Sequence, residues 1–160
     1  MSVNYTIKCN SYIKSFGDDG NMNESKIQDV FRLNKESGFV RHNGIRVTEA
    51  QETHCIVEAK LGPKTSNIFG MPHGGLLFLL ADTSAGALAR VRGLSPCVTV
   101  DAYISYVSAS ENAKYVYACS EIVREGGRLC FYDVRIYDDS DFLLAVAHIT
   151  MKRVKKVEKY

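Results

Sequence analysis

The chain has 160 residues, of which 46% are hydrophobic and 24% are charged. A chain of this length forms one domain with a sizeable core, and the composition excludes wholesale disorder and collagen-like or low-complexity architectures. The 20 Lys and Arg against 18 Asp and Glu leave a formal charge of +2. This charge is too small to indicate nucleic-acid binding by bulk electrostatics.

No membrane span, secretory signal or metal site is expected. The longest strongly apolar run covers residues 76–81, whereas a membrane-spanning helix needs about 20 apolar residues. The N-terminus has no continuous apolar stretch of the kind an export signal needs, so we expect a cytoplasmic protein. The 5 cysteines are widely spaced and form no CxxC pair, which argues against a disulfide framework and against zinc.

In chain order, the first 21 residues are polar and are expected to form a flexible extension to a single domain over residues 22–160. The domain opens with a predicted amphipathic helix over Ser25–Lys35, which Gly38 is expected to end. The apolar stripe of this helix comprises Ile27, Val30, Phe31 and Leu33.

A hairpin and a buried helix are expected next. Ile45–Ala50 and Thr53–Leu61 are predicted strands, the second of which alternates in character at period two. A turn-rich loop then leads to the segment from Gly75 to about Arg92, which is apolar nearly all round. This pattern is typical of a helix that is buried on most sides.

Four further strands are predicted in the last third of the chain, separated by short turns. They cover Cys97–Val107, Lys114–Arg124, Arg128–Asp138 and Phe142–Lys152. Short turns indicate an antiparallel meander. Because strands precede and follow one long buried helix, the pattern predicts an α+β fold in which a curved antiparallel sheet covers that helix.

Two features of the central helix are candidates for chemistry. The sequence His73-Gly74-Gly75 stands at its start, where the first amides lack partners within the helix and can polarise a carbonyl oxygen. Asp82 places a carboxylate among apolar residues, where burial costs free energy unless the charge is partnered. A functional carboxylate is the favoured interpretation. The structural alternatives are that the glycines only turn the loop into the helix and that Asp82 faces outward.

The spacing of these groups predicts a shared site. Asp82 lies seven residues beyond Gly75 and on the same face of the helix, but about 10 Å further along the axis. One helix therefore cannot bring both groups to one carbonyl. Two such helices packed antiparallel about a twofold axis can place Asp82 of one subunit opposite Gly74 of the other, and twofold dimers are the commonest oligomers.

The chain resembles the PaaI-type hotdog-fold acyl-CoA thioesterases through one spaced pattern, Asn67-x5-His73-Gly74-Gly75-x6-Asp82, followed after 16 intervening residues by Thr99. The resemblance covers about residues 38–152. It implies the hotdog fold, a sheet wrapped around one helix, and hydrolysis of an acyl-CoA to a free acid and coenzyme A. It further implies no cofactor beyond the coenzyme A of the substrate, and a homodimer that pairs into a homotetramer. Bulky candidate pocket residues, Phe69, Met71 and Phe78, predict an aryl or medium-chain acyl group.

The resemblance also implies roles for single residues. The amide of Gly74 and the side chain of Asn67 would polarise the thioester carbonyl. Asp82 of the partner subunit would activate water or attack directly, and the hydroxyl of Thr99 would help to place that water. His73 would order the loop through hydrogen bonds rather than act as the base.

Contacts to the coenzyme A nucleotide would come from turn backbones and basic residues. The candidates are Gly75, Gly127 and Arg128, with Arg90 or Arg92 and the basic C-terminal tail as further choices.

Two other functions stay open. An enoyl-CoA hydratase or dehydratase would pair His73 with Asp82 for proton transfer, and a non-catalytic hotdog domain would bind acyl-CoA without turnover. Loss of the conjugated absorbance of an enoyl-CoA would identify the first, and binding without turnover would identify the second.

Overall fold

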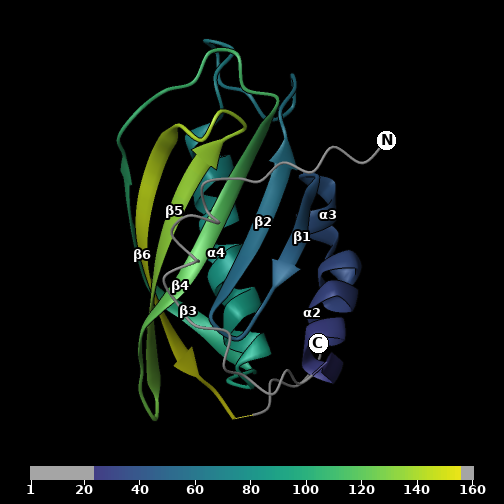
Figure 1. Cartoon of the computed structure of the whole chain (residues 1–160), viewed down its shortest axis with the longest axis vertical. Coiled ribbons are helices and arrows are strands. Elements are labelled where there is room, and N and C mark those ends of the chain that lie inside the picture. The colour runs from purple at the N-terminus through teal and green to yellow at the C-terminus, as the bar shows by residue number, and fades with distance from the viewer. Residues whose placement is uncertain (1–23, 156–160) are drawn as a thin grey trace.

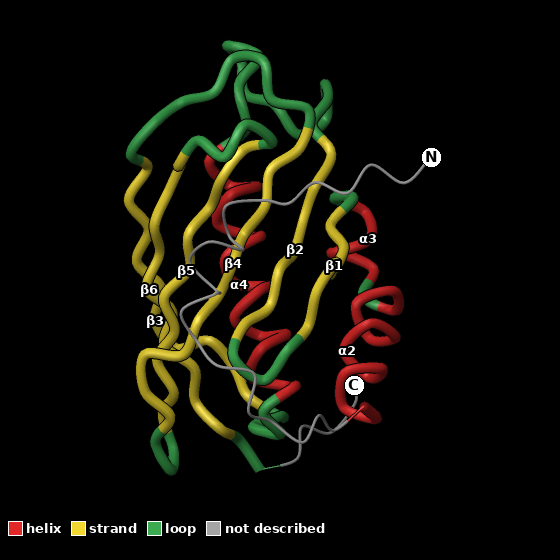
Figure 2. Tube along the Cα trace, viewed as in Figure 1, coloured by secondary structure: helices red, strands yellow, loops and turns green. Residues whose placement is uncertain are grey.

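The computed structural model describes residues 24–155, in which a curved antiparallel sheet wraps around one long helix (Figures 1 and 2). The α+β architecture predicted from the sequence is confirmed. The predicted flexible extension over residues 1–21 lies outside the described residues. In chain order the described elements are α2 (Glu24–Glu36), α3 (Gly38–His42), β1 (Ile45–Ala50), β2 (His54–Lys60), α4 (Gly74–Val91), β3 (Cys97–Tyr106), β4 (Tyr115–Glu125), β5 (Leu129–Asp138) and β6 (Leu143–Arg153).

The strand bounds agree closely with those predicted, but the first helix does not end as expected. Gly38 begins a second short helix, α3, instead of ending the helical region. The interruption lies at Ser37, whose φ of −66° and ψ of 111° are extended. The helical path ends only at Gly44, which has a φ of +67° that glycine adopts without a Cβ penalty.

The strand order is β1-β2-β4-β5-β6-β3, which corrects the predicted meander. Strands β4, β5 and β6 do follow one another, but β3 pairs antiparallel with β6 at the edge of the sheet, with Thr99 opposite Met151. The space beside β4 is taken by β2. Turn lengths do not reveal this arrangement, because the β3–β6 pairing joins segments that are far apart in the sequence.

Helix α4 lies in the core and is tied to the sheet by two buried serines. The Ser84 hydroxyl donates a hydrogen bond to the Cys55 carbonyl of β2 at 3.0 Å. The Ser120 hydroxyl of β4 donates to the Ser84 carbonyl at 3.0 Å. By length and composition α4 would also pass as a membrane span, but 56% of it is buried inside the molecule, as in a core helix.

Helix α2 covers the side of the domain next to β1. It packs on β1 and on α4, and its Val30 side chain is 3% exposed. Strand β3 lies on the other side of α4 (Figure 1). The face of α4 turned away from the sheet is therefore flanked by α2 and β3, which positions the site described next.

Candidate active site

The start of α4 is capped by its own histidine. His73 Nδ1 accepts a hydrogen bond from the Gly75 amide at 2.9 Å, and the His73 carbonyl accepts one from the Leu76 amide at 2.9 Å. Within residues 24–155, the Gly74 N–H has no hydrogen-bond partner. An N–H at the start of a helix carries partial positive charge. Among the amides of Gly74, Gly75 and Leu76, only that of Gly74 is therefore available to donate a hydrogen bond to an external acceptor.

Asn67 lies beside Gly74 and is oriented by its loop. Its Oδ1 accepts hydrogen bonds from the amides of Phe69, at 2.9 Å, and Met71, at 3.1 Å. Because both partners are donors, the side-chain atom that meets them is the oxygen, and the Nδ2 group keeps its own hydrogens for other acceptors. Asn67 and Gly74 line the same cavity, which has a volume of about 200 Å³.

Sequence reasoning missed Tyr106, which lies at the end of β3 and contacts Gly74. The phenol donates a hydrogen bond to the Gly74 carbonyl at 3.0 Å. A Cβ on residue 74 would lie 3.2 Å from the Tyr106 ring, so this position favours glycine for its lack of a side chain. No sequence signal could have identified this contact, because it joins residues 32 positions apart through tertiary packing.

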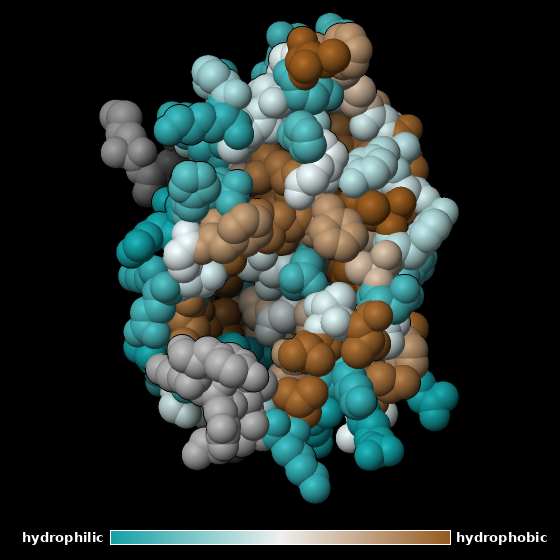
Figure 3. All heavy atoms as spheres, turned by 180° about the vertical axis from the view of Figure 1, so that it is seen from behind, coloured by the Kyte–Doolittle hydropathy of each residue, from teal (hydrophilic) through white to brown (hydrophobic). Residues whose placement is uncertain are grey.

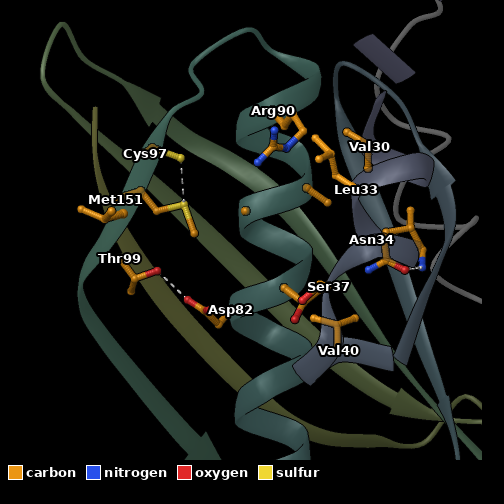
Figure 4. A pocket seen from close by; sticks show the side chains of 15 residues that line it. Val30, Leu33, Asn34, Ser37, Val40, Asp82, Arg90, Cys97, Thr99 and Met151 are labelled. Atoms are coloured by element: carbon orange, nitrogen blue, oxygen red, sulfur yellow. Dashed lines mark hydrogen bonds between the residues drawn. The ribbon is translucent and has the colours of Figure 1, made fainter. Parts of the chain in front are cut away.

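Asp82 lies in the middle of α4 and is partly buried. The hydroxyl of Thr99 on β3 donates a hydrogen bond to Asp82 Oδ1 at 2.5 Å (Figure 4). In the described part of the chain, this is the only hydrogen bond to the Asp82 carboxylate, so Oδ2 is free. The structure therefore brings together two residues that the sequence places 17 positions apart.

Asp82 stands between two cavities on the face of α4 that is turned away from the sheet. One has a volume of about 410 Å³ and extends between α2, α4 and β3. The other, of about 460 Å³, also contains His73 and Gly75. Figure 3 shows this side of the molecule, where apolar side chains gather around a hollow. Neither cavity includes Gly74 or Asn67.

The proposed oxyanion donors and the carboxylate are thus separate within one chain. Gly74 and Asp82 are eight residues apart on α4, which corresponds to about 12 Å along the helix axis. The two groups therefore cannot both reach one thioester carbonyl in a single protomer.

The predicted nucleotide contacts do not gather at one place. Gly75 lies at the start of α4, whereas Gly127 and Arg128 lie in the turn between β4 and β5. That turn is at the end of the sheet where Arg92, just after α4, pairs with Glu125 at 2.8 Å. Among residues 24–155, no group of three or more His, Cys, Asp or Glu side chains could hold a metal ion.

The edge strand β3 presents an unusual surface. On its outer side it has no neighbouring strand within the described sheet. Large apolar side chains along and just after it are 43–62% exposed; they are Val98, Val100, Tyr103, Tyr106 and Val107. An apolar edge strand is a template for pairing with another chain.

Comparison with known proteins shows that the chain is similar to thioesterases. Residues 69–145 match the family model of the thioesterase superfamily. Human acyl-coenzyme A thioesterase 13 is 28% identical over 116 residues, which cover 71% of this chain and 82% of the relative. The matched region of the family model contains Gly74, Asp82 and Thr99, and Asn67 lies just before it.

Solved structures share the architecture. The Escherichia coli PaaI protein from the phenylacetic acid degradation operon superposes with a TM-score of 0.78 at 19% identity, covering 86% of this chain and 99% of that protein. A hypothetical thioesterase from Streptococcus pneumoniae, solved with coenzyme A, superposes with a TM-score of 0.65 at 23% identity. That likeness covers 84% of this chain and 98% of the other.

Proposed function

We propose that this chain, which matches the thioesterase superfamily model over residues 69–145 and shares the PaaI-type hotdog fold, hydrolyses an acyl-CoA to a free acid and coenzyme A. One observation carries the proposal: Gly74, whose N–H has no hydrogen-bond partner among the described residues, lines a cavity with Asn67, while the Asp82 carboxylate accepts a hydrogen bond from Thr99. These are the two chemical functions that thioester hydrolysis needs, namely donors for a developing oxyanion and a base or nucleophile.

The proposed reaction begins with the thioester carbonyl oxygen accepting hydrogen bonds from the Gly74 N–H and from Asn67 Nδ2. Negative charge grows on this oxygen as the carbonyl carbon is attacked, so fixed donors stabilise the transition state more than the substrate. Asp82 either takes a proton from the attacking water or attacks the carbon itself. The carbon–sulfur bond then breaks. If Asp82 acted as the base, the proton that it took from water passes to the thiolate of coenzyme A. If Asp82 attacked the carbon, water hydrolyses the resulting mixed anhydride, which frees the acid, restores the carboxylate and supplies the proton to the thiolate.

The site is proposed to form between two protomers. Gly74 and Asn67 would come from one subunit, and Asp82 with Thr99 from its partner. The axial separation of about 12 Å between Gly74 and Asp82 within one helix supports this arrangement. The exposed apolar edge of β3 supports it as well, because Thr99 and Tyr106 lie on that strand. We propose the homodimer as the catalytic unit and a homotetramer as its further assembly.

The first test measures thioester loss by direct absorbance for short, medium, long and aryl acyl-CoAs. The Asp82→Asn variant is expected to lose activity by at least about a hundredfold while keeping the wild-type circular dichroism spectrum. Asp29→Asn serves as the matched control, because Asp29 is also a helical aspartate but lies exposed on α2 in an ion pair with Arg32. Full turnover by a folded Asp82→Asn protein would refute the assignment.

A second test addresses sharing of the site. Asn67→Ala and Asp82→Asn proteins, each inactive alone, are unfolded together and refolded as a mixture. If one protomer supplies Asn67 and the other Asp82, half of the dimers are mixed and each of these has one intact site, so about a quarter of the wild-type activity returns. If verified mixed dimers recover no activity, the site is not shared between protomers, and Gly74, Asn67, Asp82 and Thr99 would have to act within one chain.

The same substrate panel distinguishes the other functions. Loss of the conjugated absorbance of an enoyl-CoA, with its thioester intact, would indicate a hydratase that uses His73 and Asp82, which line one cavity. Tight binding of acyl-CoA without any turnover would indicate a non-catalytic domain.

A further inference from the structure

The 410 Å³ cavity beside Asp82 has walls of both apolar and polar side chains and one cationic group, Arg90 (Figure 4). Helix α4 forms its floor, and α2 and β3 form its sides. The apolar side chains that line it include Val30, Leu33, Val47 and Met151. The cationic group is Arg90, in the last turn of α4.

Arg90 and Asp82 mark the two ends of one row on α4. Asp82, Gly86 and Arg90 follow one another at intervals of four residues, so they share a face of the helix. Arg90 is about 12 Å beyond Asp82 along the axis, and side chains on a helix lean back toward its N-terminus. Figure 4 shows the guanidinium at the side of the pocket near Cys97.

The Arg90 guanidinium has no carboxylate partner among residues 24–155. This distinguishes it from Arg32, Arg46 and Arg92, each of which pairs with a carboxylate within 2.9 Å. Arg90 is also partly buried. A guanidinium that is partly buried and has no carboxylate partner can still donate hydrogen bonds, so Arg90 is available to bind an anion that enters the cavity.

Gly86 connects the two ends of the row. A Cβ at this position would meet only the Met151 Cε, at 3.6 Å, so packing does not require glycine here. Glycine within a helix is nevertheless less stable than alanine. The missing side chain keeps the floor of the cavity open between Asp82 and Arg90, which gives an acyl chain a continuous path.

We propose that this cavity holds the acyl group and that Arg90 binds a carboxylate at its far end, so that the substrate class is the ω-carboxyacyl-CoAs. This inference rests on the proposed function. The guanidinium offers a planar fork that matches a carboxylate with two hydrogen bonds. The axial separation of the two ends keeps the substrate's carboxylate away from Asp82, while its neutral thioester carbonyl lies next to Asp82.

The test compares kcat/KM for adipoyl-CoA with hexanoyl-CoA, and for suberoyl-CoA with octanoyl-CoA. Wild type is expected to prefer the carboxylated member of at least one pair by about tenfold or more, the usual effect of a hydrogen bond to a charged group. Arg90→Met should abolish this preference and Arg90→Lys should retain part of it. Arg32→Met is the matched control and should keep the preference, because Arg32 is exposed on α2 and pairs with Asp29 and Glu36 outside the cavity.

Hydrolysis of hexanoyl-CoA and octanoyl-CoA with no preference for their carboxylated analogues would overturn the inference and leave the proposed function intact. A preference that survives in Arg90→Met would overturn it too. If no acyl-CoA is hydrolysed, the proposed function fails. The inference is then tested separately by measuring the binding of adipoyl-CoA and hexanoyl-CoA to the Asp82→Asn variant by calorimetry. Tighter binding of adipoyl-CoA than of hexanoyl-CoA, lost in Asp82→Asn/Arg90→Met, would support it, and equal binding would overturn it.

Discussion

Replacement of Gly86 by alanine should make the protein more stable and less active. Gly86 lies inside α4, and a Cβ added there makes ordinary van der Waals contact with Met151 at 3.6 Å. The change from glycine to alanine in a helix interior is worth about 1 kcal/mol in helix propensity. Since no clash offsets this gain, the free energy of unfolding should rise by about 1 kcal/mol. In a domain of this size the melting temperature should rise by about 2–4 °C.

The added methyl group takes space from the floor of the cavity between Asp82 and Arg90. We therefore expect kcat/KM to fall more for octanoyl-CoA than for acetyl-CoA, which does not reach beyond Asp82. Stability is measured by urea unfolding at one fixed protein concentration, because subunit association contributes to the apparent value. Turnover is followed by thioester absorbance.

Gly126→Ala is the control for this reasoning. A Cβ there would lie 2.6 Å from the backbone carbonyl oxygen of Leu129, so the turn between β4 and β5 must shift and the protein should lose stability. A destabilised Gly86→Ala protein would refute the packing argument. Equal losses of turnover on acetyl-CoA and octanoyl-CoA would refute the place of Gly86 in the acyl cavity.

Three further predictions concern other parts of the fold. Tyr106→Phe removes the donor to the Gly74 carbonyl and should lower kcat/KM by about fivefold, or about 1 kcal/mol, with little change in urea unfolding. The hydrogen bond from His54 lowers the pKa of the Glu49 carboxyl, so its contribution to stability is complete above pH 4.5 and is lost as the pH falls through the lowered value. The free energy of unfolding of wild type should therefore fall more steeply with decreasing pH below pH 4.5 than that of the His54→Gln variant. Burial raises the pKa of the Cys55 thiol to about 12, so mass spectrometry should find it unalkylated at pH 8 until urea is added.

Much of the fold could be predicted because its signals are local. The apolar segment after Gly75 identified α4, since a helix that is apolar on nearly every face must be buried. The period-two alternation after Thr53 identified β2 and its hairpin with β1. The two errors have physical causes. Whether a helix continues past Ser37 depends on how α3 packs, and the pairing of β3 with β6 depends on contacts between distant segments.

The candidate site was predictable only as far as spacing and chemistry allow. The positions of Gly74 and Asp82 on one helix give their separation directly, so a site shared between protomers remains a prediction from helix geometry. The contact of Tyr106 with Gly74 and the cavity that contains Arg90 could not be predicted, because both are made by the packing of β3 and α2 against α4. From the sequence, Arg90 was a basic residue near the end of a helix and one of several candidate contacts to the coenzyme A nucleotide, and nothing in the sequence placed it in a cavity with Asp82.

The two serine hydrogen bonds at the core also limit how this protein can diversify. A smooth apolar helix can rotate or slide within a sheet at little cost, but the bonds of Ser84 and Ser120 are directional and fix the orientation of α4 against β2 and β4. Asp82 therefore keeps its direction even when residues on the cavity side change. Under the proposed function, substitutions at Gly86 or Arg90 would alter the accepted acyl group without displacing the proposed catalytic carboxylate, so new specificities would arise by single mutations that leave the fold in place.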